Sequence, residues 1–331
     1  MTPAFAAPVF AASIALMLLA SAQFAHRLDH VGFRLGLPEA LLGLLTALAA
    51  DAPEISSAIS ALVQGDRSVA VGVVVGSNAF NLAAMLGVSA VVTARVRARH
   101  ETLELEAFVG LWLLAVMVAV VAGALDGRVG GVLVGAVVVP YVVLLAAGPR
   151  LARSLPRAGS RFLLRSFGEQ HRRERTLDSR REALGILAVL VLALVLIVAG
   201  SVGAVRAATD LARSWSVPEE LVGVLVLAIL TSLPNAWTGV RFGLQGRGSA
   251  LMSETLNSNS INVVAGLAVP AALGTLTAFS GLAVFDLAWL LGMTAAALVL
   301  FAGRDGAGRS AGAFLIALYA AFLAVQVAAR V

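Results

Sequence analysis

Ten stretches of the chain are apolar over about the length that a membrane-spanning helix needs, roughly 20 residues. Short polar segments separate them. The stretches are Ala4–Phe24, Leu37–Val63, Ser68–Ala94, Ala107–Leu125, Val129–Gly148, Ala183–Val205, Leu221–Val240, Ala250–Ala278, Gly281–Phe301 and Ala311–Ala329. Hydrophobic residues make up 60% of the chain and charged residues 13%, so the natural solvent is a lipid bilayer. We expect an all-α polytopic membrane protein with ten transmembrane helices.

The first stretch has two interpretations. Ser21-Ala22-Gln23 near its end resembles the cleavage site of a signal peptide. However, no positively charged segment precedes the stretch, and a signal peptide requires one. A retained helix is therefore the favoured interpretation.

The segment 149–182 is the only sizeable hydrophilic one, and it holds ten arginines between Arg150 and Arg181. Cytoplasmic loops carry an excess of basic residues, so this segment and the smaller basic loops on its side should face the cytoplasm. Both termini then lie outside, in a cell inner membrane. The segment is either a solvated connector or a contact for anionic lipid headgroups. The net charge of +5 is spread over several loops, which does not indicate a nucleic-acid partner.

The connector separates a first half, 1–148, from a second half, 183–331, with five expected helices each. A polar motif occurs once in each half, at about 37–94 and 217–278. Pro53 and Ser77 of the first copy are each followed 181 positions later by their counterparts, Pro234 and Ser258. The two copies should cross the membrane in opposite directions, so we expect inverted repeats, which place a substrate site near the midplane.

The first copy brings two acids into an apolar stretch. Asp51 and Glu54 are three residues apart, so on a helix they share a face. An ionised carboxylate at that depth costs roughly 2.5–3.5 kcal/mol unless a cation or proton neutralises it. Pro53 and Pro234 lack an N–H, and each leaves a backbone carbonyl without its helical partner. Hard cations such as calcium bind six to eight oxygens of these kinds.

Further hydroxyl and amide side chains of both copies complete a candidate metal site. The full set is Asp51, Glu54, Ser77, Asn81, Thr231, Ser232, Asn235, Ser258 and Asn262. The alternative is that these polar side chains only join helices by hydrogen bonds. Glu54 to Asn81 and Asn235 to Asn262 both span 27 positions, and this identical spacing favours a binding site.

Two other residues are candidates for a gate. Glu254 lies four residues before Ser258 on the same helical face, near the cytoplasmic mouth. It is either a simple carboxylate at the mouth or an inner gate and proton site. Arg241 could extend to the interface or pair with Glu254 to close the inner vestibule. Separately, Gly76 has the spacing from Gly72 that lets helices approach closely.

Both copies resemble the alpha repeats of the sodium/calcium exchangers, in the calcium/cation antiporter superfamily. The residues that carry the resemblance are Pro53-Glu54 with Gly76–Asn81, and Thr231–Pro234 with Ser258-Asn259 and Asn262. The resemblance implies ten helices around a central ion site and exchange of calcium for sodium or protons by alternating access. It also implies Glu54, Ser77, Asn81 and Ser258 as ligands, completed by backbone carbonyls around 47–50 and 228–231.

The chain departs from the family pattern in its charges. Asn235 stands where the family usually has glutamate, Asn262 replaces an aspartate common in the family, and Asp51 replaces a serine. Both acids thus belong to the first repeat. We expect a cation antiporter with an altered site, whose counter-ion is sodium or protons. The alternative is a non-transporting relative that acts as an ion sensor or membrane scaffold.

An enzyme is not indicated. The four histidines lie in loops or at helix ends, and no HExxH pair is present. Cysteine is absent, which excludes thiol catalysis and thiolate metal sites. We expect no cofactor, only inorganic cations and lipid as partners, and a ten-helix bundle that could function as a monomer.

Overall fold

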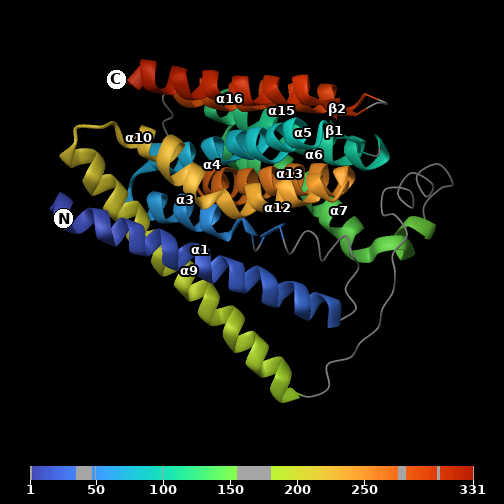
Figure 1. The fold of residues 1–331 in the computed structure, drawn as a ribbon, viewed down its shortest axis with the longest axis horizontal. Coiled ribbons are helices and arrows are strands. Elements are labelled where there is room, and N and C mark those ends of the chain that lie inside the picture. The colour runs from blue at the N-terminus through green and yellow to red at the C-terminus, as the bar shows by residue number, and fades with distance from the viewer. Residues whose placement is uncertain are drawn as a thin grey trace.

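The computed structural model describes residues 2–34, 47–48, 50–98, 100–154, 180–274, 281–303 and 306–330. Within these ranges the chain is almost entirely helical, which confirms the expected all-α class (Figure 1). One short antiparallel pair, β1 (Arg95–Val96) with β2 (Ala307–Gly308), lies within the described ranges. Most of the basic connector, 155–179, lies outside the described residues, so both interpretations of it stay predictions.

The helices fall into two groups. Long, largely uninterrupted helices form the periphery: α1 (Pro3–Arg34), α6 (His100–Val121), α7 (Gly127–Ser154), α9 (Arg180–Ser214), α15 (Gly281–Phe301) and α16 (Arg309–Arg330). Shorter helices carry the repeated motifs: α3 (Ala52–Gln64), α4 (Arg67–Asn81), α5 (Ser89–Thr93), α10 (Glu219–Leu221), α11 (Ala228–Thr231), α12 (Leu233–Leu244), α13 (Gly248–Val263) and α14 (Val269–Ala272).

Three π-helical segments lie within the motif-bearing part: η1 (Leu82–Val88), η2 (Val222–Leu227) and η3 (Val264–Ala268). Segment η1 continues α4, and η3 continues α13. At the offset of 181 positions, η3 corresponds to positions inside η1. Such widened turns frequently occur at functional sites. The backbone of the two motif copies therefore shares an irregularity that the sequence alone did not predict.

Seven helices in the described part of the chain are long and apolar enough to cross a membrane, or up to eight if a bent pair counts as one span. The expected ten helices are therefore not confirmed. The second expected helix, Leu37–Val63, lies partly outside the described residues. The eighth, Ala250–Ala278, is largely present as α13, η3 and α14, but α13 is rich in serine and asparagine and is not among the seven.

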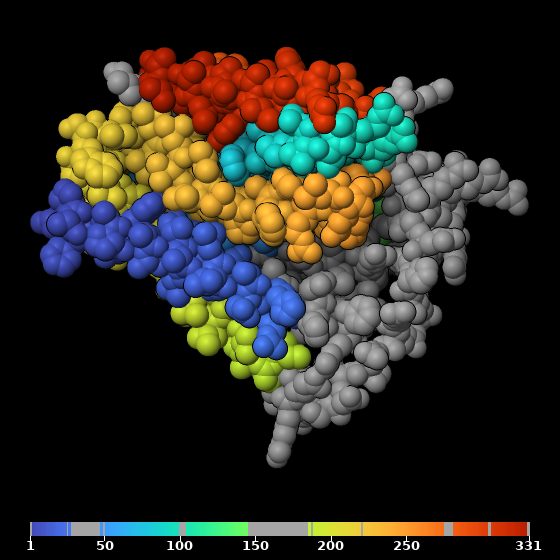
Figure 2. Space-filling model, in the orientation of Figure 1, coloured from blue at the N-terminus to red at the C-terminus, as the bar shows by residue number. Residues whose placement is uncertain are grey.

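The motif-bearing helices lie in the middle of the bundle. Figure 1 shows α3, α4, α12 and α13 between α15 and α16 on one side and α1 and α9 on the other. On the face drawn in Figure 2, the orange surface of α12 separates the red surface of α16 from the blue surface of α1. Both chain ends lie at the same end of the bundle in Figure 1.

Burial is distributed as a bilayer protein requires. Large apolar side chains point outward, with Val63 82% exposed and Val299 76% exposed. In the centre, by contrast, the side chains of Asp51, Glu54 and Asn81 are all 0% exposed. A chain folded in water would place these classes the other way round, so the surface is matched to lipid and the interior to polar chemistry.

Close helix contacts depend on glycine at two points. A Cβ on Gly76 of α4 would lie 2.8 Å from both the Ala228 Cβ and the Val224 carbonyl, so the expected close approach at Gly76 is confirmed. A Cβ on Gly200 of α9 would lie 2.8 Å from the Ser13 carbonyl of α1. These distances are shorter than real Cβ contacts, so only glycine lets the backbones approach this closely.

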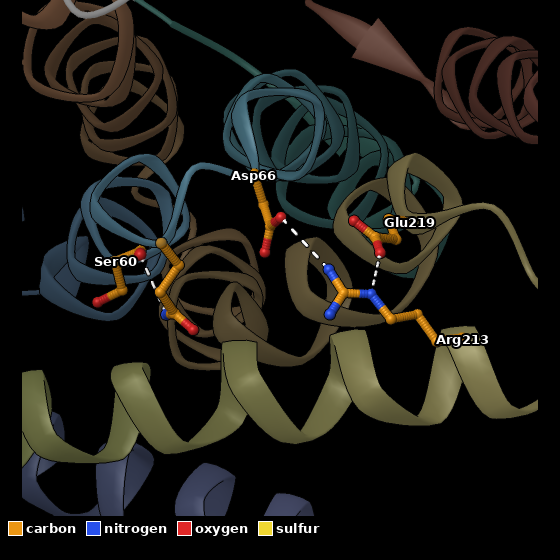
Figure 3. A network of polar contacts seen from close by, with 5 residues as sticks. Ser60, Asp66, Arg213 and Glu219 are labelled. Atoms are coloured by element: carbon orange, nitrogen blue, oxygen red, sulfur yellow. Dashed lines mark hydrogen bonds and ion pairs between the residues drawn. The ribbon is translucent and has the colours of Figure 1, made fainter. Parts of the chain in front are cut away.

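A charged cluster joins three elements at one end of the bundle (Figure 3). Arg213, near the end of α9, donates to Glu219 of α10 at 2.6 Å and lies 3.9 Å from Asp66, which precedes α4. Partial burial raises the pKa of Asp66, and the nearby Glu219 charge raises it further, while Arg213 acts in the opposite direction. The cluster therefore links the loop after α9 to the start of α4.

Candidate functional site

The backbone breaks at the same point in both motifs. Asp51 precedes α3 with φ −83° and ψ −3°, and Ser232 precedes α12 with φ −86° and ψ 0°. In each copy a proline occupies the first turn of the following helix, where its missing N–H is tolerated. The second break bends the chain by 51° between Val222–Thr231 and Leu233–Leu244. The expected proline kinks therefore place Asp51 and Ser232 at equivalent helix starts.

The two acids are held by donors from the opposite copy. Asn235 Nδ2 donates to Asp51 Oδ1 at 2.6 Å and to Glu54 Oε1 at 3.2 Å. Ser232 Oγ donates to Glu54 Oε1 at 2.8 Å. The pairs are crossed, because at the offset of 181 Ser232 corresponds to Asp51 and Asn235 to Glu54. Each copy thus supplies one part of a shared polar centre: the first copy supplies two carboxylates at the start of α3, and the second supplies hydrogen-bond donors at the start of α12.

The fifth and sixth members of this centre are Ser258 of α13 and Asn81 of α4. Ser258 Oγ donates to Asp51 Oδ1 at 2.5 Å. Asn81 Nδ2 and Asn235 Nδ2 both donate to Ser258 Oγ, at 3.2 and 3.3 Å. All six side chains are no more than 1% exposed. The structure thus brings together side chains from α4 and α13 and from the starts of α3 and α12, and we call these six residues the cage.

Four asparagines connect the cage to a reciprocal network between α4 and α13. Asn78 Nδ2 donates to the Asn259 carbonyl at 3.0 Å, and Asn259 Nδ2 donates to the Asn78 carbonyl at 3.1 Å. Asn81 Nδ2 donates to Asn259 Oδ1 at 3.2 Å, and Asn262 Nδ2 donates to Asn78 Oδ1 at 3.1 Å. Each bond has a counterpart at the offset of 181. Asn78 and Asn259 lie within the two motif copies but were not among the expected ligands. Their separation of 181 positions was a signal in the sequence that could have identified them.

The cage contains acceptor oxygens that receive no hydrogen bond from any described residue. They are Asp51 Oδ2, Glu54 Oε2, Asn81 Oδ1 and Asn235 Oδ1, and Asn262 Oδ1 is a fifth beside the cage. All are buried, and a buried acceptor without a partner is costly. The described residues contain no group of three His, Cys, Asp or Glu that could hold a metal. The oxygens of the cage come from two carboxylates, from amides and from hydroxyls, and this combination suits a hard cation.

Two of the expected ligands make a different contact. Ser77 Oγ donates to the Val74 carbonyl at 3.1 Å, and Thr231 Oγ1 donates to the Ala228 carbonyl at 3.4 Å. Both hydroxyls therefore bond to their own helix, although both residues are fully buried. Their oxygen lone pairs stay available, so their assignment as ligands stays a prediction.

The two gate candidates are not paired in this structure. Arg241 is exposed on α12, while Glu254 of α13 is partly buried. In the described part of the chain, no ion pair joins them. Glu254 lies within electrostatic range of both Asp51 and Glu106. A role for Arg241 and Glu254 in closing the vestibule stays a prediction.

A second polar cluster, which the sequence analysis missed, surrounds Glu106 of α6. Ser253 Oγ donates to Glu106 Oε1, and Asn257 Nδ2 donates to the same oxygen at 3.4 Å. Tyr141 of α7 donates to Asn257 Oδ1 at 2.7 Å. We call these four residues the Glu106 cluster. The fourth apolar stretch was expected to begin at Ala107, one residue after Glu106, whereas α6 begins at His100 and Glu106 is only 7% exposed.

Known proteins resemble this chain over most of its length. The profile of the family described as sodium/calcium exchanger protein matches residues 5–147 and 185–328. The chain is 27% identical over 242 residues to the inner membrane protein YrbG of Escherichia coli, covering 71% of this chain and 70% of the relative. It is 24% identical over 263 residues to the putative antiporter CaxA of Alkalimonas amylolytica, covering 77% of each.

Solved structures share the fold. The sodium-calcium exchanger NCX_Mj superposes with a TM-score of 0.61 at 19% identity, over 96% of this chain and 97% of the other. The H⁺/Ca²⁺ exchanger CAX superposes with a TM-score of 0.73 at 14% identity, over 96% of this chain and 82% of the other. The matched profile covers both halves of the chain, with their two motif copies. The chain therefore belongs to the sodium/calcium exchanger protein family.

Proposed function

We propose that this protein is a secondary cation antiporter that moves calcium, or a related divalent cation, in exchange for sodium or protons. The observation that carries the proposal is the set of buried, unpartnered acceptor oxygens in the cage. Each carboxylate has one oxygen held by donors, and its other oxygen is available. These buried oxygens have no hydrogen-bond donor among the described residues to stabilise them, and a bound cation would stabilise them by its positive charge.

The charge of the cage limits what it can hold. Asp51 and Glu54 together balance one divalent cation, while Asn235, Ser232 and Ser258 add neutral donors and acceptors. Two carboxylates also balance two protons or two sodium ions, so an exchange of one divalent cation for either pair leaves the site uncharged. The printed names of the solved neighbours, a sodium-calcium and an H⁺/Ca²⁺ exchanger, support both versions.

The cage also suits alternating access. The carboxylates lie at the start of α3 in the first half, and their donors lie at the start of α12 and on α13 in the second, so a relative movement of the halves would open the cage. The reciprocal asparagine bonds support an arrangement as inverted repeats. The position of both chain ends at one end of the bundle supports a shared side for the termini. A location in the cell inner membrane is part of the proposal and is supported by the name of one relative. The proposal also places both termini outside the cytoplasm, because the arginine-rich segment 149–182 should face the cytoplasm.

The test is calcium uptake into liposomes that contain the purified protein, driven first by a sodium gradient and then by a pH gradient. We expect uptake under one gradient, which names the counter-ion. Glu54→Gln should abolish it, because the cage loses a carboxylate. The matched control is Glu104→Gln, which changes an exposed acid outside the cage. No uptake under either gradient from folded protein would overturn the proposal in favour of a sensor or scaffold.

A further inference from the structure

Helix α13 carries polar side chains on two different faces. Ser258 and Asn262 are four residues apart and face the cage network. Ser253 and Asn257 are also four residues apart, but they contact Glu106 of α6 and, through Asn257, Tyr141 of α7. The Glu106 cluster is therefore a second polar centre that shares a helix with the cage but none of its side chains.

The hydrogen-bond donors of this cluster form a chain that ends at Glu106 Oε1. Tyr141 donates to Asn257 Oδ1, Asn257 Nδ2 donates to Ser253 Oγ at 3.3 Å, and both Ser253 and Asn257 donate to Glu106 Oε1. Glu106 Oε2 is buried and has no hydrogen-bond partner among the described residues. The carboxyl group thus has one oxygen that accepts several donors and one oxygen that accepts none.

This arrangement fits a proton better than a metal ion. A metal would need several oxygens directed at one point, whereas Asn257 and Ser253 direct their hydrogens at the carboxylate. The titratable side chains described on the helices that pack against α6 are Tyr141, Glu254 and Asp286, apart from Arg128 at the far end of α7. None of the first three is a cation that could balance a carboxylate. A proton on Oε2 removes the charge at the least cost.

We propose that Glu106 is a proton-binding site, separate from the cage, whose occupancy tunes transport. Glu106 is the third residue of the apolar span Glu104–Val121, so it lies near the end of the span, close to the exposed Glu104. Glu254 lies within electrostatic range of both Glu106 and Asp51. A proton that leaves Glu106 therefore adds negative charge within electrostatic range of Glu254, which in turn acts on Asp51 of the cage. The link to transport rests on the proposed antiport function; the proton site itself does not.

Infrared difference spectroscopy on a pH change tests the site directly, because a buried protonated carboxyl group has its own C=O stretching band. In the full-length protein we expect such a band to disappear as pH rises. The E106Q variant should lack it, while the matched E104Q variant should retain it. Tyr141→Phe removes the outermost donor of the cluster and should shift the band without abolishing it. A band that is unchanged in E106Q overturns the proposal.

Two further measurements separate the alternatives. Calcium or sodium added at constant pH should leave the Glu106 band unchanged; a band that disappears on cation addition would make the cluster a cation site and overturn the proton assignment. In liposomes, E106Q should lose one titrating step from the pH profile of initial uptake while keeping uptake itself, and E106D should restore that step. Absence of uptake in the wild type and in every variant contradicts the antiport function. If the infrared band is then present in the wild type and absent in E106Q, the proton site stands without it.

Discussion

Asn78 and Asn259 exchange hydrogen bonds across the interface of α4 and α13, each side-chain amide donating to the other's backbone carbonyl at 3.0 and 3.1 Å. The two residues occupy equivalent positions of the two motif copies. Because two hydrogen bonds run in opposite directions between these equivalent residues, they fix both the distance between α4 and α13 and the register of one helix along the other. The cage depends on that register, because Asn81 lies about one turn from Asn78 on α4 and Ser258 is the residue before Asn259 on α13.

Loss of this exchange should destabilise the protein. Asn78→Ala and Asn259→Ala should each lower the free energy of unfolding by about 0.6–2 kcal/mol, the range for buried interhelical hydrogen bonds in membranes. The double variant should lose less than the sum, because the same interface is broken twice. Thermal unfolding in detergent measures the effect. The control is Gln245→Ala, an exposed amide at the end of α12; equal losses in variant and control would contradict the prediction.

Asp51→Asn should weaken calcium binding at least tenfold, which corresponds to about 1.4 kcal/mol. The physical reason is that Asp51 Oδ2 is one of the two carboxylate oxygens of the cage that accept no hydrogen bond from a described residue. Calcium titration of purified protein by calorimetry measures the affinity. Glu104→Gln is again the matched control, since it removes an acid of the same charge outside the cage. Unchanged affinity in Asp51→Asn would exclude the residue as a ligand.

Asn235→Asp should make the protein dependent on divalent cations for its stability. The substitution removes the donor to Asp51 and Glu54 and places a third carboxylate beside them, so like charges repel unless a cation is bound. We expect a lower melting temperature than wild type without calcium, and a larger upward shift when calcium is added. Asn235→Ala removes the donor without adding charge and serves as the comparison. Equal calcium shifts in both variants would show that the added charge does not face the cation.

Gly76→Ala should destabilise the contact between α4 and the bent second-repeat helix. The added Cβ would lie 2.8 Å from both the Ala228 Cβ and the Val224 carbonyl, so the helices must separate. Overpacking of this kind costs about 1–3 kcal/mol. Gly135→Ala on α7 is the matched control, because a Cβ there meets nothing within 4 Å. Thermal unfolding should show a clear loss for Gly76→Ala and none for the control.

The Asp66 carboxyl predicts a pH dependence of stability. Its pKa is raised above the ordinary 3.8 in the folded protein, so ionisation of Asp66 disfavours folding. The penalty is absent below the ordinary pKa, grows as pH rises from there to the raised pKa, and is constant above it. Asp66→Asn should therefore match wild type at low pH and melt at a higher temperature near neutral pH.

Burial is the main cause of the raised pKa of Asp66, and Glu219→Gln tests the second cause, the neighbouring negative charge. It removes the neighbouring charge that raises the pKa of Asp66, so the stabilising effect of Asp66→Asn should be smaller in its presence. Melting temperatures of the four proteins across the pH range provide the measurement. A stability difference between wild type and Asp66→Asn that is independent of pH would contradict the prediction.

Much of the site could be predicted because its signals are local. The prolines, the acids at three-residue spacing and the repeated Ser and Asn positions lie within short segments, and a helix fixes which of them share a face. Asp51, Glu54, Asn81, Ser232, Asn235 and Ser258 do meet in one cage. Their function as cation ligands stays a prediction.

The pairings themselves could not be predicted. A sequence pattern gives the face of each helix but not the atoms that oppose it, so the crossed bonds from Ser232 to Glu54 and from Asn235 to Asp51 depend on tertiary packing. Ser77 and Thr231 illustrate the same point, because each hydroxyl bonds to its own helix. Glu106 was missed for another reason. Hydropathy places span boundaries by average composition, and a carboxyl group at the edge of a span is assigned to the loop.

The distribution of charge in the cage has a consequence for how the two halves divide their work. Both carboxylates lie at the start of α3, while the start of α12 contributes only dipoles, which can turn or withdraw without moving a net charge. Under the proposed antiport function, the charge that balances the cation would therefore stay with the first half, whichever half moves. The second half would supply only neutral donors and acceptors. The two motif copies would then have different roles, the first holding the cation and the second covering it.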